Sequence, residues 1–343
     1  MSEKSQWGSK LGFILASAGS VIGLGSVWKF PYMTAANGGG GFLLIFLIST
    51  ILIGFPLLLA EFALGRSAGV SAIKTFGKLG KNNKYNFIGW IGAFALFILL
   101  SFYSVIGGWI LVYLGIEFGK LFQLGGTGDY AQLFTSIISN PAIDLGAQAA
   151  FILLNIFIVS RGVQKGIERA SKVMMPLLFI VLPQLFDKMP FGTIFYVLFL
   201  FATVTSSVVM LEINVGNITN QDNSKRAKWS VILGILTFVF GIPSALSYGV
   251  MADVHIFGKT FFDAMDFLVS NLLMPFGALY LSLFTGYIFK KALAMEELHL
   301  DERAWKQGLF QVWLFLLRFF VSSFQSSSLW SSLPNLCNQK GLE

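Results

Sequence analysis

The stretch Ala18–Pro31, AGSVIGLGSVWKFP, decides how this chain is interpreted. It lies in an apolar run that begins at Leu11 and is long enough to cross a bilayer, which takes about 20 residues. Yet it carries three glycines, Gly19, Gly23 and Gly25, and each glycine costs a helix about 1 kcal/mol relative to alanine. Backbone that leaves a helix inside a membrane persists only where protein buries it or where it lines a cavity. We therefore expect a transmembrane helix that is broken here so that its freed backbone groups bind a ligand.

The composition is that of a membrane protein that crosses the bilayer several times. Of the 343 residues, 55% are hydrophobic and 12% are charged, against about 25% charged in soluble domains. We attribute the net charge of +7 to Lys and Arg in cytoplasmic loops and not to nucleic-acid binding. The single cysteine, Cys337, excludes an intramolecular disulfide and a cysteine-rich metal site. The polar start, MSEKSQWGSK, indicates that no cleavable signal peptide is present.

The length rule predicts an all-α bundle of about nine membrane spans. They lie near residues 11–35, 41–64, 87–118, 142–160, 166–186, 191–215, 229–250, 261–289 and 308–322. Lys and Arg gather in alternate loops, which places the N-terminus in the cytoplasm. Residues 292–307 indicate a short amphipathic helix at the inner surface.

A broken helix offers two kinds of binding group, because its half-helix ends carry opposite partial charges. The backbone amides of Leu24 and Gly25 suit an anion such as a carboxylate, and the carbonyls near Gly19, Val21 and Ile22 suit a hard cation. The alternative is that the glycines form a GxxxG packing face with no ligand.

Other polar residues within the spans also have two interpretations. The hydroxyls of residues 202–207, ATVTSS, can supply oxygen ligands for Na+, or they can bond back to their own helix. Lys29 and Asp266 can pair across an outer vestibule, or each can reach outward to water. Tyr103 can place its hydroxyl on a substrate carboxylate, or it can serve packing alone.

The sequence gives little support to an enzyme. It contains no P-loop, HExxH or nucleophile-elbow pattern. His255 and His299 fall on opposite sides of the membrane in this topology, so they cannot share one metal site.

Taken together, these segments resemble the neurotransmitter:sodium symporter family, in its bacterial amino-acid-transporter branch. The matching segments are GSVIGLGSVWKFPY, the NGGGGF turn, GFPLLLAEFALGR ending at Arg66, GIERASK (166–172), MMP (174–176), LPQLFDKMP (182–190), ATVTSS (202–207) and AMDFL (264–268). The resemblance covers most of residues 7–320. It implies two inverted five-helix repeats, with substrate and Na+ held at the midplane between two broken helices.

The resemblance also assigns roles to residues. One Na+ site would take carbonyls of Gly19, Ile22 and Ala202 with the hydroxyls of Thr205 and Ser206. A second, incomplete Na+ site would take the Val21 carbonyl and Ser26. The substrate would contact Val21, Leu24, Gly25, Leu99, Tyr103 and Met210, and Lys29 and Asp266 would form the outer gate.

The chain departs from the family pattern in two ways. Ser26 and Lys29 stand where the family usually has Asn and Arg, and Lys29 lacks the bidentate fork with which Arg pairs a carboxylate. The sixth and seventh helices are also missing, and with them the second broken helix that inverted repeats require. The chain therefore divides into residues 1–186 with helices 1–5, residues 187–290 with helices 8–10, a truncated eleventh helix at 304–322 and a tail at 323–343.

The function implied is sodium-coupled symport of amino acids or related small amines by alternating access. Na+ would be the co-transported ion, with no organic cofactor and no nucleic-acid partner, in a multi-pass protein surrounded by lipid in the cell membrane. The alternative is a truncated remnant of such a transporter that no longer transports.

Overall fold

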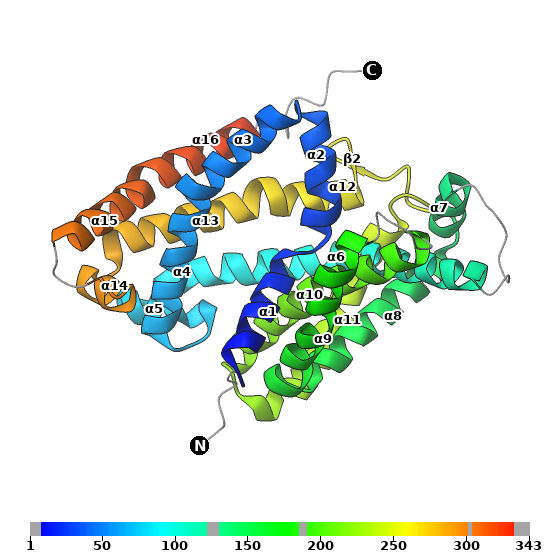
Figure 1. Cartoon of the computed structure of the whole chain (residues 1–343), viewed down its shortest axis with the longest axis horizontal. Coiled ribbons are helices and arrows are strands. Elements are labelled where there is room, and N and C mark those ends of the chain that lie inside the picture. Colours follow the sequence, from blue (N-terminus) through cyan, green and yellow to red (C-terminus); the bar gives the residue numbers. More distant parts are fainter. Residues whose placement is uncertain (1–7, 122–129, 185–190, 301–303, 333–343) are drawn as a thin grey trace. The chain divides into compact units, whose positions relative to one another are not determined.

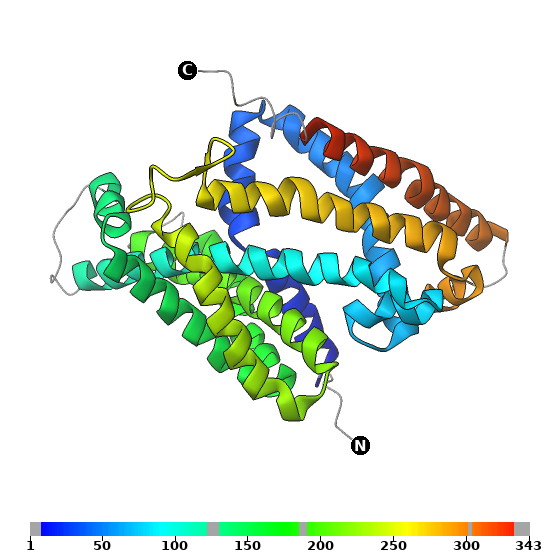
Figure 2. The same ribbon diagram turned by 180° about the vertical axis from the view of Figure 1, so that it is seen from behind.

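A computed structural model describes residues 8–121, 130–184, 191–300 and 304–332, and the part described is almost entirely helical (Figure 1). The expected features at residues 185–190 and 333–343, including Cys337, lie outside it. Two short strands, His255–Ile256 (β1) and Lys259–Thr260 (β2), pair in antiparallel fashion. Figure 2 shows the same chain from behind.

The described residues up to 184 form nine α-helices. They are α1 (Lys10–Val21), α2 (Phe30–Ala36), α3 (Gly40–Ser49), α4 (Phe55–Ala68), α5 (Ala72–Gly80), α6 (Asn86–Leu121), α7 (Tyr130–Ile138), α8 (Pro141–Ser160) and α9 (Arg169–Gln184). Wider π-helical turns precede α2, α4 and α9, at Gly25–Lys29 (η1), Thr50–Gly54 (η2) and Val163–Glu168 (η4), and a 3-10 turn, Asn83–Tyr85 (η3), precedes α6.

The second half continues in the same way. Its helices are α10 (Phe191–Thr219), α11 (Asn223–Leu246), α12 (Phe261–Phe267), α13 (Met274–Leu283), α14 (Lys291–Glu297), α15 (Ala304–Phe315) and α16 (Ser322–Ser332). Further π-helical turns lie at Leu268–Leu273 (η5), Phe284–Ile288 (η6) and Leu316–Val321 (η7).

The first span is broken, as the sequence predicts. Helix α1 ends at Val21, the chain resumes a helical course at Gly25, and the axes of the two segments differ by 58°. The turn that follows, after α2, depends on glycine, because Gly38 (φ +91°) and Gly39 (φ +58°) occupy the left-handed region. The NGGGGF segment is therefore a true chain reversal and not a continuation of the helix.

Within the described residues, seven helices are long and apolar enough to cross a membrane, or eight if the bent pair α1 and α2 counts as one span. The expected count of about nine is not confirmed. The segment expected at 166–186 is helix α9, which is described only as far as Gln184. At the other end, helix α16 continues beyond residue 322, where the sequence predicted a tail.

The chain forms two compact units, which do not follow the predicted division by repeats. Unit 1 comprises residues 1–33 and 96–265, and unit 2 comprises residues 34–95 and 266–343. In unit 1, α1 packs against α9 and α10, and α8 packs along α11 (Figures 1 and 2). The division by repeats stays a prediction.

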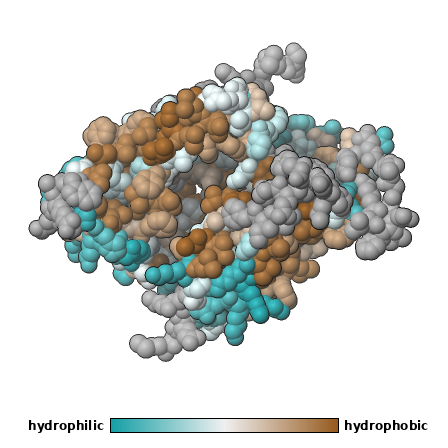
Figure 3. Space-filling view, viewed as in Figure 1, coloured by the Kyte–Doolittle hydropathy of each residue, from teal (hydrophilic) through white to brown (hydrophobic). Residues whose placement is uncertain are grey.

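Each unit has its own apolar core. Phe151, Val159 and Leu211 are fully buried in unit 1, and Phe284 and Leu317 are fully buried in unit 2. Much of the outer surface is also apolar, as Figure 3 shows. On α3, for example, six consecutive side chains from residue 43 to residue 48 are all exposed large hydrophobics. Such a surface is suited to lipid and not to water.

Candidate functional site

The broken helix and α10 meet through a cluster of oxygen atoms in unit 1. Thr205 Oγ1 lies 3.0 Å from the carbonyl oxygen of Gly19 and 3.0 Å from that of Ala202. Ser206 Oγ lies 3.2 Å from each of the same two oxygens and 3.1 Å from the carbonyl oxygen of Ser20. Four of the five residues assigned to the first Na+ site therefore lie together, and the contact with Ser20 was not expected.

This cluster has more acceptors than donors. A hydroxyl carries one proton, yet Thr205 Oγ1 lies within hydrogen-bond distance of three carbonyls, the third being that of Phe201 at 2.9 Å. Ser206 Oγ likewise lies within hydrogen-bond distance of three carbonyls and has one proton to donate. Within α10 the carbonyls of Phe201 and Ala202 also accept backbone amides, so the acceptors left for a further partner are the Gly19 and Ser20 carbonyls at the break. Thr205 and Ser206 are 3% exposed, so water cannot readily supply the donors that these two carbonyls lack. A buried excess of oxygen lone pairs favours a hard cation, which binds through oxygen ligands.

The break in the helix brings a backbone amide to Tyr103. The amide of Leu24 donates to the Tyr103 hydroxyl at 3.3 Å, and both residues are buried. Gly23 makes this approach possible, because a Cβ there would collide with Ser206 Oγ and lie 2.8 Å from the Tyr103 hydroxyl. The amide and the hydroxyl expected to hold a substrate carboxylate are thus neighbours.

The second predicted Na+ site is only partly formed by the described residues. Ser26 Oγ donates to the Val21 carbonyl at 2.8 Å, across the break in the helix. The side chain of Val21 is 72% exposed, and Gly25 and Ser26 are exposed as well. This side of the broken helix therefore has no protein wall in the described part of the chain.

The remaining predicted residues are less closely linked. Leu99 and Met210 are half-buried, on α6 and α10. Asp266 accepts a hydrogen bond from Ser270 at 3.0 Å. Because Lys29 belongs to unit 1 and Asp266 to unit 2, the outer gate stays a prediction. Groups of three or more His, Cys, Asp or Glu residues that could hold a metal ion do not occur among the described residues.

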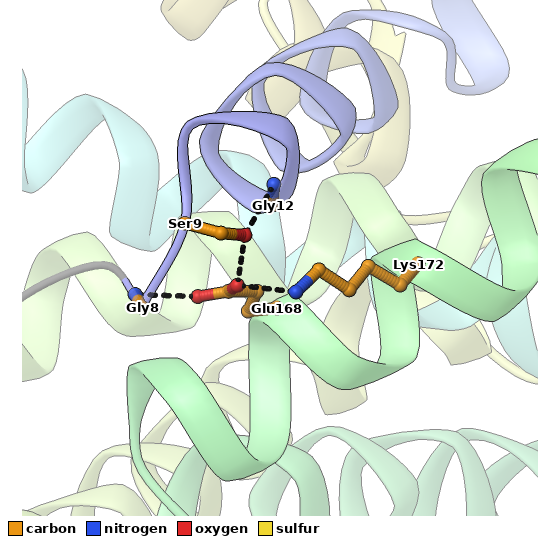
Figure 4. A network of polar contacts seen from close by, with 5 residues as sticks. All are labelled: Gly8, Ser9, Gly12, Glu168 and Lys172. Atoms are coloured by element: carbon orange, nitrogen blue, oxygen red, sulfur yellow. Dashed lines mark hydrogen bonds and ion pairs between the residues drawn. The ribbon is translucent and has the colours of Figure 1, made fainter.

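A carboxylate network at the start of α1 was not assigned a role from the sequence (Figure 4). Glu168 Oε2 accepts from the amide of Gly8 at 2.7 Å, and Oε1 accepts from Ser9 Oγ at 2.6 Å and from Lys172 Nζ at 2.7 Å. Ser9 Oγ in turn caps α1 by accepting from the amide of Gly12 at 3.0 Å. The segment GIERASK (166–172) could have indicated part of this network, because Glu168 stands four residues before Lys172, which is the spacing of an ion pair on one helix face.

Comparisons with known proteins agree with this geometry. The profile of the Sodium:neurotransmitter symporter family matches residues 4–123. A Bacillus subtilis protein named "Uncharacterized sodium-dependent transporter YhdH" is 38% identical over an alignment of 436 positions that covers 94% of this chain and 96% of that protein. This chain belongs to the sodium:neurotransmitter symporter family. It is therefore a member of a transporter family and not an enzyme.

Two further relatives bear on the substrate. The "Sodium-dependent neutral amino acid transporter B(0)AT2" of Rattus norvegicus is 37% identical over 116 residues, which is 34% of this chain and 16% of that protein. The crystal structure of MhsT in complex with L-phenylalanine superposes with a TM-score of 0.87 at 28% identity, covering 96% of this chain and 100% of that one. The fold is thus the symporter fold.

The alignment with YhdH also bears on the missing helices. Its 436 positions exceed the 343 residues of this chain, so YhdH has a substantial number of residues without counterparts here. This chain is shorter than full-length members of its family. The position of the gap, between the fifth and eighth helices, stays a prediction.

Proposed function

We propose that this chain is a sodium-coupled symporter of amino acids or related small amines that works by alternating access. The observation that carries the proposal is the buried excess of carbonyl and hydroxyl oxygens where Gly19 and Ala202 meet Thr205 and Ser206. Na+ bound there would join the broken helix to α10, so that binding of the ion would favour one arrangement of these two helices. A ligand stabilises only the state that it binds.

The substrate part of the proposal rests on the neighbouring groups. At the break, the amide of Leu24 donates to the hydroxyl of Tyr103, and that hydroxyl carries a proton of its own to donate. A carboxylate accepts strong, short hydrogen bonds from such groups. The amide of Gly25 and the side chains of Val21, Leu99 and Met210 would complete the contacts. Related proteins that carry neutral amino acids or bind L-phenylalanine support this substrate class.

The orientation and the surroundings belong to the same proposal. We place the chain in the cell membrane with its N-terminus in the cytoplasm, because Lys and Arg gather in alternate loops. The Val21 carbonyl and Ser26 would hold part of a second Na+ site, and Lys29 with Asp266 would close the outer side.

The experiment is uptake of a labelled amino-acid mixture into proteoliposomes, with an inward gradient of Na+ or of choline. We expect uptake only with Na+, and we expect the double variant Thr205→Ala, Ser206→Ala to abolish it. Thr219→Ala is the matched control, because the Thr219 hydroxyl on the same helix bonds only to its own Val215 carbonyl, at 2.8 Å. Uptake that persists in the double variant would refute the assignment of the sodium ligands.

One observation favours a second candidate, a remnant of a transporter that no longer transports. The exposed flank of the broken helix, at Val21, Gly25 and Ser26, is where a second wall of the site would lie. A folded, reconstituted chain that takes up no amino acid under any gradient would establish this alternative.

A further inference from the structure

A second buried polar cluster lies in unit 1 away from the oxygen cluster of Thr205 and Ser206. Asp144 is the fourth residue of α8 and is 1% exposed. Its Oδ1 accepts a hydrogen bond from Trp109 Nε1 on α6 at 2.8 Å, whereas its Oδ2 is buried and has no partner. A buried carboxyl group in a membrane protein is expected to have a function and a partner.

The next turn of α8 carries a second buried oxygen atom that has no hydrogen-bond partner. Gln148 is fully buried, and its amide nitrogen donates to Ser104 Oγ at 3.1 Å. Its Oε1 is buried without a partner. Residues four apart lie next to each other on one face of a helix, so Asp144 Oδ2 and Gln148 Oε1 lie on the same face.

Helix α11 packs along α8 and contacts Gln148. A Cβ at Gly241 would collide with the amide nitrogen of Gln148, so α11 approaches the Gln148 side chain directly. Ser244 follows Gly241 by three residues on the same face. It is fully buried, and its hydroxyl also has no partner.

Aromatic rings separate Asp144 from water. The Trp109 ring, which is 8% exposed, packs edge-on against Phe134 with a centroid distance of 5.2 Å. It also stacks on Phe262 at 6.3 Å. Hydration therefore does not compensate a charge on Asp144.

No cation compensates the charge either, in the part of the chain that the structure describes. The charged residues of α11 (Lys225, Arg226 and Lys228) lie at its opposite end, and Arg226 there pairs with Glu212 of α10. Other titratable groups on neighbouring elements are Glu117 of α6, Lys165 and Glu168 of η4, and Tyr248, which donates to Asp263 at 3.1 Å. None of these forms a described ion pair or hydrogen bond with Asp144.

The start of α8 does not supply the missing donors. Asn140 precedes the helix, and its side chain accepts from the amides of Ala142 and Ile143 at 3.1 and 3.4 Å. The amide of Asp144 itself donates to the Asn140 carbonyl at 3.1 Å. The backbone donors of this helix end are thus taken by Asn140.

These observations favour the protonated form of Asp144. An ionised Asp144 would put a bare carboxylate oxygen on the same helix face as the bare amide oxygen of Gln148, and the Ser244 hydroxyl donates to neither of them. A protonated Asp144 supplies a donor, to Gln148 Oε1 directly or through one buried water. The unpartnered oxygens, of Asp144, Gln148 and Ser244, are too few for a hard divalent cation, which takes six or more oxygen ligands.

We propose that Asp144 is a proton-binding site inside unit 1, which keeps its proton at a pH where a free aspartate is ionised, with the Gln148 amide oxygen as acceptor for its proton. The site is separate from the candidate sodium ligands and does not depend on the proposed transport function. Binding of H+ at this site, between α6, α8 and α11, is a second ion-binding equilibrium beside the proposed binding of Na+.

The test is infrared spectroscopy of the purified full chain labelled with aspartate that carries 13C in its side-chain carboxyl group. A free aspartate, whose pKa is about 3.9, is ionised at about pH 5.5, so a protonated one is distinctive at that pH. We expect a carboxylic-acid carbonyl band at that pH which moves with the 13C label and with exchange into D2O. Among the described residues Asp144 is the sole buried aspartate, which ties the band to it.

Variants complete the assignment. Asp144→Asn should remove the band, and Asp253→Asn, at an exposed aspartate, should leave it unchanged. If Asp144→Asn does not fold, Asp144→Glu serves instead, because glutamate escapes the label and the band should lose its isotope shift.

Three results would overturn the proposal. The first is a folded, labelled protein with no aspartic-acid band at about pH 5.5. The second is a band that persists in Asp144→Asn. The third is a band that appears only when Na+ is replaced by N-methylglucamine, because the group would then bind a metal cation in place of a proton.

Discussion

Thr205 Oγ1 lies 3.0 Å from the carbonyl oxygen of Gly19, although the two residues are 186 positions apart in the chain. This contact joins the middle of α10 to the last turn of α1 before the break. Removing the hydroxyls of Thr205 and Ser206 takes both side-chain donors from the Gly19 carbonyl and removes two ligands of a cation. We predict that the double alanine variant loses at least tenfold in Na+ affinity, which corresponds to about 1.4 kcal/mol.

The measurement is the rise in thermal unfolding temperature on adding NaCl in place of choline chloride, which reports binding without requiring transport. The wild-type chain should be stabilised by Na+ and the double variant should not. Thr219→Ala should respond to Na+ as the wild type does. An equal Na+ response in the double variant would exclude these hydroxyls as ligands.

Gly23 is the position where the broken helix comes closest to Tyr103 and Ser206. Because a Cβ there would collide with Ser206 Oγ, Gly23→Ala must push α1 away from α10. Overpacking of this kind costs about 1–3 kcal/mol. We predict a lower unfolding temperature in detergent and a weaker response to Na+.

Gly25→Ala is the matched control for Gly23→Ala. A Cβ at Gly25 meets nothing within 4 Å, so the same substitution two residues away should not lower the unfolding temperature. If both variants behave alike, glycine would be needed at the break for backbone flexibility and not for close approach.

The sequence alone located the broken helix and the hydroxyl groups that contact its first half; their role as sodium ligands stays a prediction. Three glycines in an apolar run indicate where helical backbone ends, and the ATVTSS segment marks the hydroxyls that meet it. The sequence could not reveal that Ser206 also reaches the Ser20 carbonyl, or that Glu168 and Arg226 are buried. Such contacts depend on which faces of distant helices meet, and a single sequence does not contain that information.

The end of the chain was predicted less well for a similar reason. Residues 323–332 are rich in serine and contain no further apolar span, and this composition predicts a tail. In the structure they continue the helix as part of α16, which packs against α13. Ser322 Oγ, for instance, lies 3.2 Å from Ser282 Oγ. Packing between helices outweighs local propensity here.

Glu168 holds the start of α1 against the start of α9. It accepts from the Gly8 amide and the Ser9 hydroxyl, and the Ser9 hydroxyl caps the helix at Gly12. Hydrogen bonds to a charged group contribute about 1.5–3 kcal/mol each. We predict that Glu168→Gln increases hydrogen exchange at the first turn of α1 by about tenfold or more, since tenfold corresponds to about 1.4 kcal/mol.

The control is Glu297→Gln, which removes the carboxylate that pairs with Arg66 at 3.0 Å. The Arg66 side chain is 56% exposed, and exposed ion pairs contribute about 0–1 kcal/mol. Exchange at α1 should stay as in the wild type in this variant. Unchanged exchange in Glu168→Gln as well would show that the network does not hold α1.

Glu212 on α10 and Arg226 on α11 form a buried ion pair, with the Arg226 side chain only 3% exposed. Arg226 also donates through Nε to Asn223 at 3.2 Å. Removing one partner of such a pair leaves an uncompensated buried charge, which costs about 3–5 kcal/mol. We therefore predict that Glu212→Gln strongly lowers the unfolding temperature.

Replacing both partners separates the charge effect from packing. The double variant Glu212→Leu, Arg226→Met removes both charges and fills similar volumes, and such replacements are often neutral or stabilising by about 1–4 kcal/mol. We expect it to unfold at or above the temperature of Glu212→Gln, measured by circular dichroism in the same detergent. Lys225→Met is the control, because the Lys225 side chain is 65% exposed and reaches Asp222 only at 3.9 Å. A double variant less stable than Glu212→Gln would show that the lone Arg226 charge is not what destabilises Glu212→Gln.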